Sequence, residues 1–228
     1  MDHEQVPTQP ENPIPPMKTT KHGDLWGLHG LEDVYFQRET QVNFWSIMGG
    51  VAVGALLTQF FPLVEQIRAS RWHLIAYFVA SMFILINGWV QTSWGALVLK
   101  WRIHLPIILP HFLTLICMAI MSLLVIDPAG WSLAAGGVLL FDLAVQRSFR
   151  LSGAWAGFSS QTIQGFAKTR RIYFLLMLMC FGASALLFFM PSIILEAIWG
   201  AVALLASSAA IVIQHTGMER ERLELGIP

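Results

Sequence analysis

Six long apolar stretches, separated by short charged connections, constrain the fold of this chain more than any other feature. A helix needs about 20 apolar residues to cross a hydrocarbon layer of about 30 Å, and a segment in lipid must satisfy its own backbone hydrogen bonds. The stretches are continuously apolar, whereas the strands of a membrane barrel alternate with a period of two. We therefore predict an all-α fold, a polytopic membrane helical bundle of about six transmembrane helices.

The predicted spans differ in length. The second is long enough to tilt in the bilayer. The fourth is short for a crossing, and it would need a thinner bilayer or a place for Asp142 and Gln146 among the headgroups. The last two are expected to form a tight hairpin through Pro191 and Ser192. Together the spans make a predicted membrane domain over residues 42–214, and they cover residues 42–64, 72–99, 105–126, 131–145, 172–190 and 193–213.

The basic residues predict the orientation of the bundle. With the N-terminus in the cytoplasm, all of the 14 Lys and Arg residues except Arg68 and Arg71 fall on the cytoplasmic side. Cytoplasmic segments of membrane proteins carry such an excess of Lys and Arg. We therefore expect both termini to be cytoplasmic. The membrane is expected to be a bacterial plasma membrane, because no eukaryotic transit signal precedes the first span.

The composition supports a membrane protein and argues against a nucleic-acid partner. Charged residues make up 12% of the chain, about half of their share in soluble domains. The formal net charge is zero, and no basic arm or patch of the nucleic-acid-binding kind occurs. The expected partners are membrane lipid and other membrane-protein chains.

Besides the short connections, four segments lie outside the predicted spans. Residues 1–23 are polar and proline-rich, which predicts a disordered tail. Residues 24–41 and the cytoplasmic loop 147–171 carry aromatic residues at helical spacing, so each is a possible interfacial amphipathic helix or a loop packed on the bundle. Residues 215–228 form a predicted charged tail.

Few polar residues occur at membrane depth, and each is a candidate for a polar path or for contacts between helices. Asn87 and Gln91 lie four residues apart on one face of the second span. They could bond neighbouring helices or line a hydrated path. Asp142 is the one carboxylate that could lie within the apolar layer, and an interfacial, locally paired charge is its alternative.

His104 and His111 lie seven residues apart, nearly on one face of the third span. A haem held by two histidines would need a second His at the same depth. Only His215 is available at the level of His104, and none at that of His111. His111 could relay protons or be satisfied by a neighbouring polar group. No cofactor is predicted, bound lipid is expected, and a pigment or haem is left open.

Glycines mark a possible packing surface in the first span. Gly49, Gly50 and Gly54 give that helix small residues on neighbouring faces, which lets helix backbones approach closely in membranes. The two cysteines, Cys117 and Cys180, lie within apolar stretches and are expected to be packing residues.

Catalytic motifs are missing from the sequence. It contains no GxSxG, no P-loop, no dinucleotide fingerprint and no HxxxH or ExxH metal motif. We therefore predict no catalytic residue, no metal site and no enzymatic activity.

Three functions remain open, and the sequence favours the first. A non-catalytic membrane subunit would pack against and scaffold partner proteins in a larger complex. A homo-oligomeric channel or membrane-perturbing protein would use the polar residues of the second and third spans as its path. A permease or carrier subunit is disfavoured by the scarce intramembrane charge and by the absence of a visible internal repeat.

Overall fold

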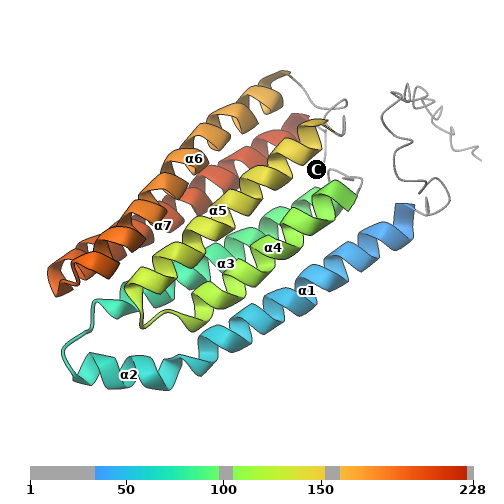
Figure 1. Cartoon of the computed structure of the whole chain (residues 1–228). Helices are drawn as coiled ribbons and strands as arrows, with labels where there is room; N and C mark the ends of the chain where they lie inside the picture. The colour runs from blue at the N-terminus through green and yellow to red at the C-terminus, as the bar shows by residue number, and fades with distance from the viewer. Residues whose placement is uncertain (1–33, 98–104, 152–159, 225–228) are drawn as a thin grey trace, which may run out of the picture. The chain divides into compact units, whose positions relative to one another are not determined.

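The computed structural model describes residues 34–97, 105–151 and 160–224, and it is helical throughout apart from short turns. The chain divides into two units, Met1–Glu32 and Asp33–Pro228, and the second unit holds all described residues. Figure 1 shows its helices, which are α1 (Val34–Thr58), α2 (Phe60–Arg68), α3 (Leu74–Leu97), α4 (Leu105–Leu123), α5 (Pro128–Leu151), α6 (Ser160–Phe189) and α7 (Ile193–Glu224).

The prediction of about six membrane helices is confirmed. Five segments of the described chain are long and apolar enough to cross a membrane, and a shorter apolar helix, Ile108–Leu123, adds a sixth. The expectation of a short fourth span is wrong, because α5 has 24 residues and is about 36 Å long at the rise of an α-helix. The long spans are Val42–Arg68, Leu74–Trp94, Pro128–Ser148, Lys168–Phe189 and Ile193–Glu219.

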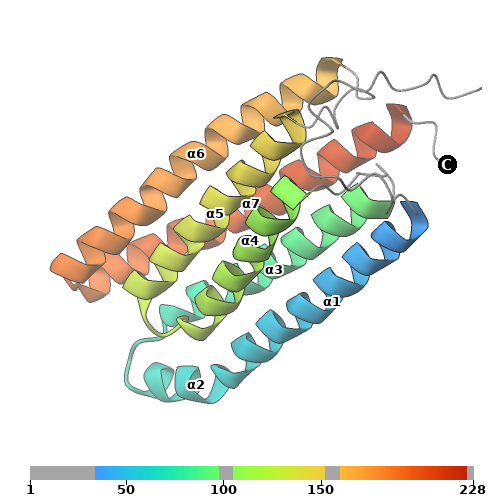
Figure 2. The same cartoon turned by 45° about the vertical axis from the view of Figure 1, so that its right-hand side comes forward.

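The spanning helices form two layers. In one layer α5 packs between α4 and α6, and in the other α3 packs between α1 and α7 (Figures 1 and 2). Helix α1 also packs on α4, which joins the layers along one edge, while α3 with α5 and α6 with α7 make few contacts. The last two spans are joined by the short turn expected at Pro191 and Ser192, because α6 ends at Phe189 and α7 begins at Ile193. This turn leads from one layer to the other, so α6 and α7 make few contacts along their length.

Two ends of the bundle are distinguished by their residues. The N-terminal end of α1 and the C-terminal end of α7 lie at the same end (Figure 2). We call this the basic end, because it holds Arg147, Lys168, Arg170 and Arg171, and the sequence predicts it to be cytoplasmic. The opposite end is the α2 end.

Local sequence signals fix the α2 end. Pro62 lacks an N–H and its ring collides with the carbonyl four residues before it, so α1 ends at Thr58 and the chain bends into α2. Helix α2 closes with a left-handed residue, Ser70 at φ 66°, and with the bond from Arg71 N–H to the Gln66 carbonyl at 2.9 Å. This turn brings Arg71 back over the bundle.

The start of α5 is equally well defined. Pro128 opens the helix, where its missing N–H costs nothing. The carboxylate of Asp127 accepts a hydrogen bond from the Gly130 N–H at 3.2 Å, which satisfies one of the free donors of the first turn. Helix α5 can therefore begin at the α2 end and continue without a break to Leu151.

The helices approach one another closely at glycines other than the predicted ones. A Cβ on Gly136 would lie 2.6 Å from the ring of Phe181, and one on Gly200 would lie 2.9 Å from the ring of Tyr77. A Cβ on Gly49, Gly50 or Gly54 would meet no atom within 4 Å. The predicted packing role of these three glycines is therefore not used within the described chain and stays a prediction for contact with another chain.

The expected non-spanning segments are helical continuations of the spans where the structure describes them. Residues 34–41 belong to α1, and most of 147–171 belongs to α5 and α6, with residues 152–159 outside the described residues. Residues 147–151 thus end α5 and residues 160–171 begin α6, and an interfacial position for this segment stays a prediction. Helix α7 likewise extends to Glu224, and the predicted tail 1–23 lies outside the described residues.

Candidate functional site

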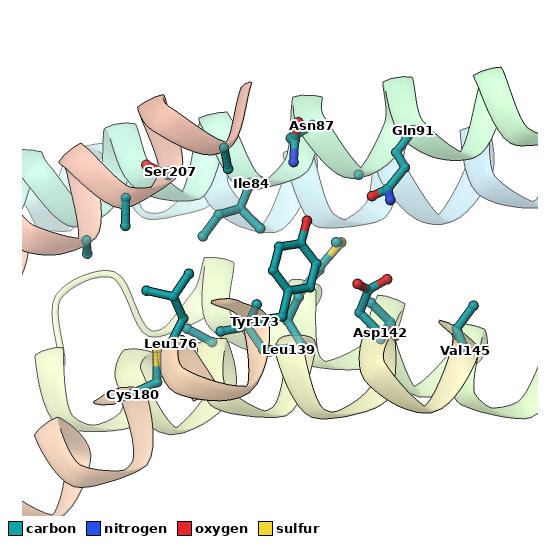
Figure 3. A pocket seen from close by; sticks show the side chains of 18 of the residues that line it. Ile84, Asn87, Gln91, Leu139, Asp142, Val145, Tyr173, Leu176, Cys180 and Ser207 are labelled. Atoms are coloured by element: carbon teal, nitrogen blue, oxygen red, sulfur yellow. The ribbon is translucent and has the colours of Figure 1, made fainter. Parts of the chain in front are cut away.

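A cavity of about 160 Å³ lies between the two helix layers. Residues from α1, α3, α4, α5, α6 and α7 line it, so all spanning helices contribute to it. Figure 3 shows side chains of α3 and α7 on one side of the cavity and side chains of α5 and α6 on the other. The cavity exists because the layers touch along the α1–α4 edge but make few contacts between α3 and α5.

Polar side chains from both layers face each other in the half of the cavity nearer the basic end. The amide of Gln91 on α3 points towards the carboxylate of Asp142 on α5 (Figure 3). One turn away, the hydroxyl of Tyr173 on α6 points towards Asn87 (Figure 3). Residues that are 51 or more positions apart in the sequence thus meet across the interior of the bundle.

Asp142 and Gln146 form a pair along α5. They lie four residues apart, and the Gln146 Nε2 amide donates a hydrogen bond to Asp142 Oδ2 at 3.0 Å. Gln146 is only 8% exposed, and its Oε1 has no hydrogen-bond partner. Asp142 makes no ion pair with any residue in the described ranges. The pair therefore offers hydrogen-bond acceptors to the cavity.

A second group without partners is formed by Trp45 on α1 and His111 on α4. Their rings meet edge to face, with centroids 4.7 Å apart. The indole Nε1 of Trp45 and both ring nitrogens of His111 are buried and have no hydrogen-bond partner. An unsatisfied buried polar group costs about 1–3 kcal/mol, so these groups are suited to a bound molecule or to water.

A hydrogen-bonded aromatic layer closes the cavity towards the α2 end. The indole of Trp131 donates to the Ser81 hydroxyl at 2.8 Å, and the indole of Trp199 donates to the Ser132 hydroxyl at 2.7 Å. The ring of Tyr77 lies edge to face on Trp131, with centroids 5.1 Å apart. All polar groups of these three aromatic side chains are satisfied, which makes the layer rigid.

A charged network covers the aromatic layer. Arg71 Nη2 and His73 Nε2 lie 2.8 and 3.0 Å from the same oxygen, Oε2 of Glu196 in the first turn of α7. The Tyr77 hydroxyl donates to the Glu196 carbonyl at 2.7 Å, which ties the network to the layer below. Arg71, Asp127 and Glu196 also line a cleft of about 300 Å³ on this side.

The structure brings most predicted site residues together. Asn87, Gln91, His111 and Asp142 all line the cavity, whereas His104 lies outside the described residues. Asp142 faces the cavity and is bonded to Gln146 on the same helix. Tyr173 was not predicted from the sequence. Gln146 was expected only among the headgroups, although its spacing from Asp142 indicated a shared helix face.

Within residues 34–97, 105–151 and 160–224, no three or more His, Cys, Asp or Glu side chains gather where they could hold a metal ion. Among the described residues that line the cavity, Asp142 is the only acidic one and none is Lys or Arg.

Comparison of the chain with protein-family models, with curated proteins and with solved structures found no match.

Proposed function

We propose that this protein is a membrane carrier that binds a small molecule in the cavity between its two helix layers. One observation carries the proposal: a cavity lined by all spanning helices contains buried polar atoms of Trp45, His111 and Gln146 without partners. A protein that only scaffolds its neighbours has no use for such a cavity, since every unsatisfied group costs free energy.

The closed α2 end supports a carrier over a channel. A channel needs a continuous polar path, but the Tyr77–Trp131 contact lies between the cavity and the cleft at the α2 end. A carrier needs this arrangement, with one side closed while the other can open. The sparse contacts between the layers leave them free to rock about the α1–α4 edge.

Thiol accessibility tests the proposal without a known substrate. The chain has two cysteines, and Cys180 lines the cavity, so Cys117→Ala leaves a single reporter. Membrane vesicles of either orientation are treated with a cationic and an anionic membrane-impermeant methanethiosulfonate. A carrier predicts modification of Cys180 from both faces without ionic conductance, because the cavity opens to each face in turn.

Two variants make this test decisive. In the cysteine-free background, Gly182→Cys places the thiol on the lipid-facing side of α6 and should resist both reagents. Trp131→Ala removes the centre of the aromatic layer and should increase modification from the α2 face. Absence of Cys180 modification from either face, with Trp131→Ala also without effect, contradicts the carrier. Steady conductance would instead indicate a channel.

A membrane scaffold is the second candidate, and the glycines of α1 favour it. Gly50 and Gly54 are exposed and meet no neighbouring atom, which leaves room for the helix of another chain. Native mass spectrometry of the gently extracted protein would report a partner chain or a second copy. Gly54→Leu should dissociate that complex while Gly182→Leu, a matched change on α6, leaves it intact. Extraction of the chain without companions would contradict the scaffold.

The carrier proposal includes three expectations from the sequence. The protein is not an enzyme, it resides in a bacterial plasma membrane, and lipid is its surrounding partner. The five long apolar helices support the membrane location.

A further inference from the structure

We infer that the cavity takes a small organic ammonium ion, with its nitrogen held at Asp142 and Gln146 and its carbon skeleton on the apolar walls. The inference rests on the proposed carrier function, because it names the substrate class of the same site. Three properties of the described lining support it: its charge, its hydrogen-bond acceptors and its size.

The charge of the lining selects for a cation. Of the lining residues that the structure describes, Asp142 is the only acidic one, and Lys and Arg are not among them. Asp142 also lacks an ion-pair partner among the residues that the structure describes. Electrostatic interactions are strong in a low-dielectric interior. A positively charged ligand would therefore be stabilised beside Asp142, and an anion would be repelled.

The free hydrogen-bonding atoms call for a ligand with several donors. The Gln146 amide uses its nitrogen to bind Asp142 Oδ2, so its Oε1 remains an acceptor without a partner, buried on a side chain that is 8% exposed. Asp142 Oδ1 is a further acceptor in the same place. A primary ammonium group carries three donors and a hydroxyl carries one, so an ammonium group can satisfy both oxygens together and a hydroxyl cannot.

The size and walls of the cavity indicate an organic cation. Its volume of about 160 Å³ is close to that of an engineered cavity of about 150 Å³ that binds benzene. Apolar side chains of Ile84, Leu139 and Leu176 form its walls. A bare metal ion would need several close oxygen ligands, and no cluster of three or more acidic, His or Cys side chains occurs in the described chain. A ligand with about seven to ten non-hydrogen atoms fits this space.

Four probes of matched shape test the inference. The purified full chain in detergent at neutral pH is studied by equilibrium dialysis with benzylammonium, benzyl alcohol, toluene and benzoate. Benzylammonium should bind at least about tenfold more tightly than the other three, which corresponds to about 1.4 kcal/mol. Asp142→Asn should remove most of this advantage, because charge-assisted hydrogen bonds are about twice as strong as neutral ones. The same variant should leave the affinity for benzyl alcohol within about twofold of its original value.

Two further variants keep the test falsifiable. Glu65→Gln neutralises an exposed carboxylate on α2 far from the cavity lining and should leave all binding unchanged. If Asp142→Asn does not fold, Gln146→Met removes the partnerless acceptor and should weaken benzylammonium selectively.

Each outcome has a distinct meaning. Equal binding of benzylammonium and benzyl alcohol, unaffected by Asp142→Asn, overturns the ammonium inference and leaves the carrier proposal standing. Preferred binding of benzoate overturns the inference as well. Binding of none of the four probes to the folded protein overturns it too, and accessibility of Cys180 then decides the carrier proposal independently.

Discussion

The aromatic layer at the α2 end and the polar half of the cavity contain similar side chains but differ in how these are satisfied. In the aromatic layer, the indoles of Trp131 and Trp199 each donate to a serine hydroxyl. In the polar half, the indole of Trp45 and the imidazole of His111 have no partner. Both regions are buried between the same two helix layers.

This difference separates a structural region from a binding region. A fully satisfied polar network stabilises one packing arrangement, whereas partnerless polar groups are stabilised only when something binds to them. The aromatic layer therefore holds the two helix layers together at the α2 end. The partnerless groups in the polar half of the cavity lower the stability of the unliganded protein, as groups in binding sites often do.

The largest effect is expected from removing the centre of the aromatic layer. Trp131 is 2% exposed, and Trp131→Ala should lower the free energy of unfolding by about 3–5 kcal/mol, through the cavity left behind and the lost ring contact with Tyr77. Urea unfolding in mild detergent micelles measures this loss in the free energy of unfolding. The control Trp89→Ala changes a half-exposed indole on α3 and should cost far less. Equal losses for both variants would show that the layer is not a special structural element.

A smaller effect is expected from the charged network above the layer. Glu196→Gln removes the negative charge shared by Arg71 and His73, and it should lower the free energy of unfolding by about 2 kcal/mol. Glu219→Gln breaks an exposed pair with Arg222 and should cost at most about 0.5 kcal/mol. Thermal unfolding of both variants in the same detergent compares them. A Glu196→Gln loss as small as that of the control would contradict a structural role for the network.

The smallest effect, with opposite sign, is expected in the polar half of the cavity. His111→Phe keeps the edge-to-face contact with Trp45 but removes two buried nitrogens without partners. The unliganded protein should gain about 1 kcal/mol in the free energy of unfolding. The same urea titration measures the gain. A loss of more than about 1 kcal/mol would indicate that His111 is satisfied by water in the resting protein, and the contrast between the two regions would then disappear.

Properties of single helices could be predicted from the sequence. The spans were found because crossing lipid requires a continuous apolar window, and that window is local in the chain. Asn87 and Gln91 were placed on one face because residues four apart in a helix share a face. Span ends were less certain: the polar residues at the end of α5 hid its full length of 24 residues.

Contacts between helices could not be predicted from the sequence. Glu196 meets Arg71 across 125 positions, and the glycines in tight contact are Gly136 and Gly200 rather than Gly54. The packed faces of these helices could not be recognised, because lipid-facing and helix-facing sides are both apolar in a membrane protein.

The sequence by itself determined that this protein is a bundle of about six membrane helices, and it predicted which end carries the positive charge. Only the tertiary structure decided that the helices form two layers and that Gln91 and Asp142 face each other in a cavity between them. The physical reason is that insertion into lipid depends on the total hydrophobicity of each segment. The pairing and rotation of helices depend instead on the shapes and hydrogen bonds of side chains distant in the chain.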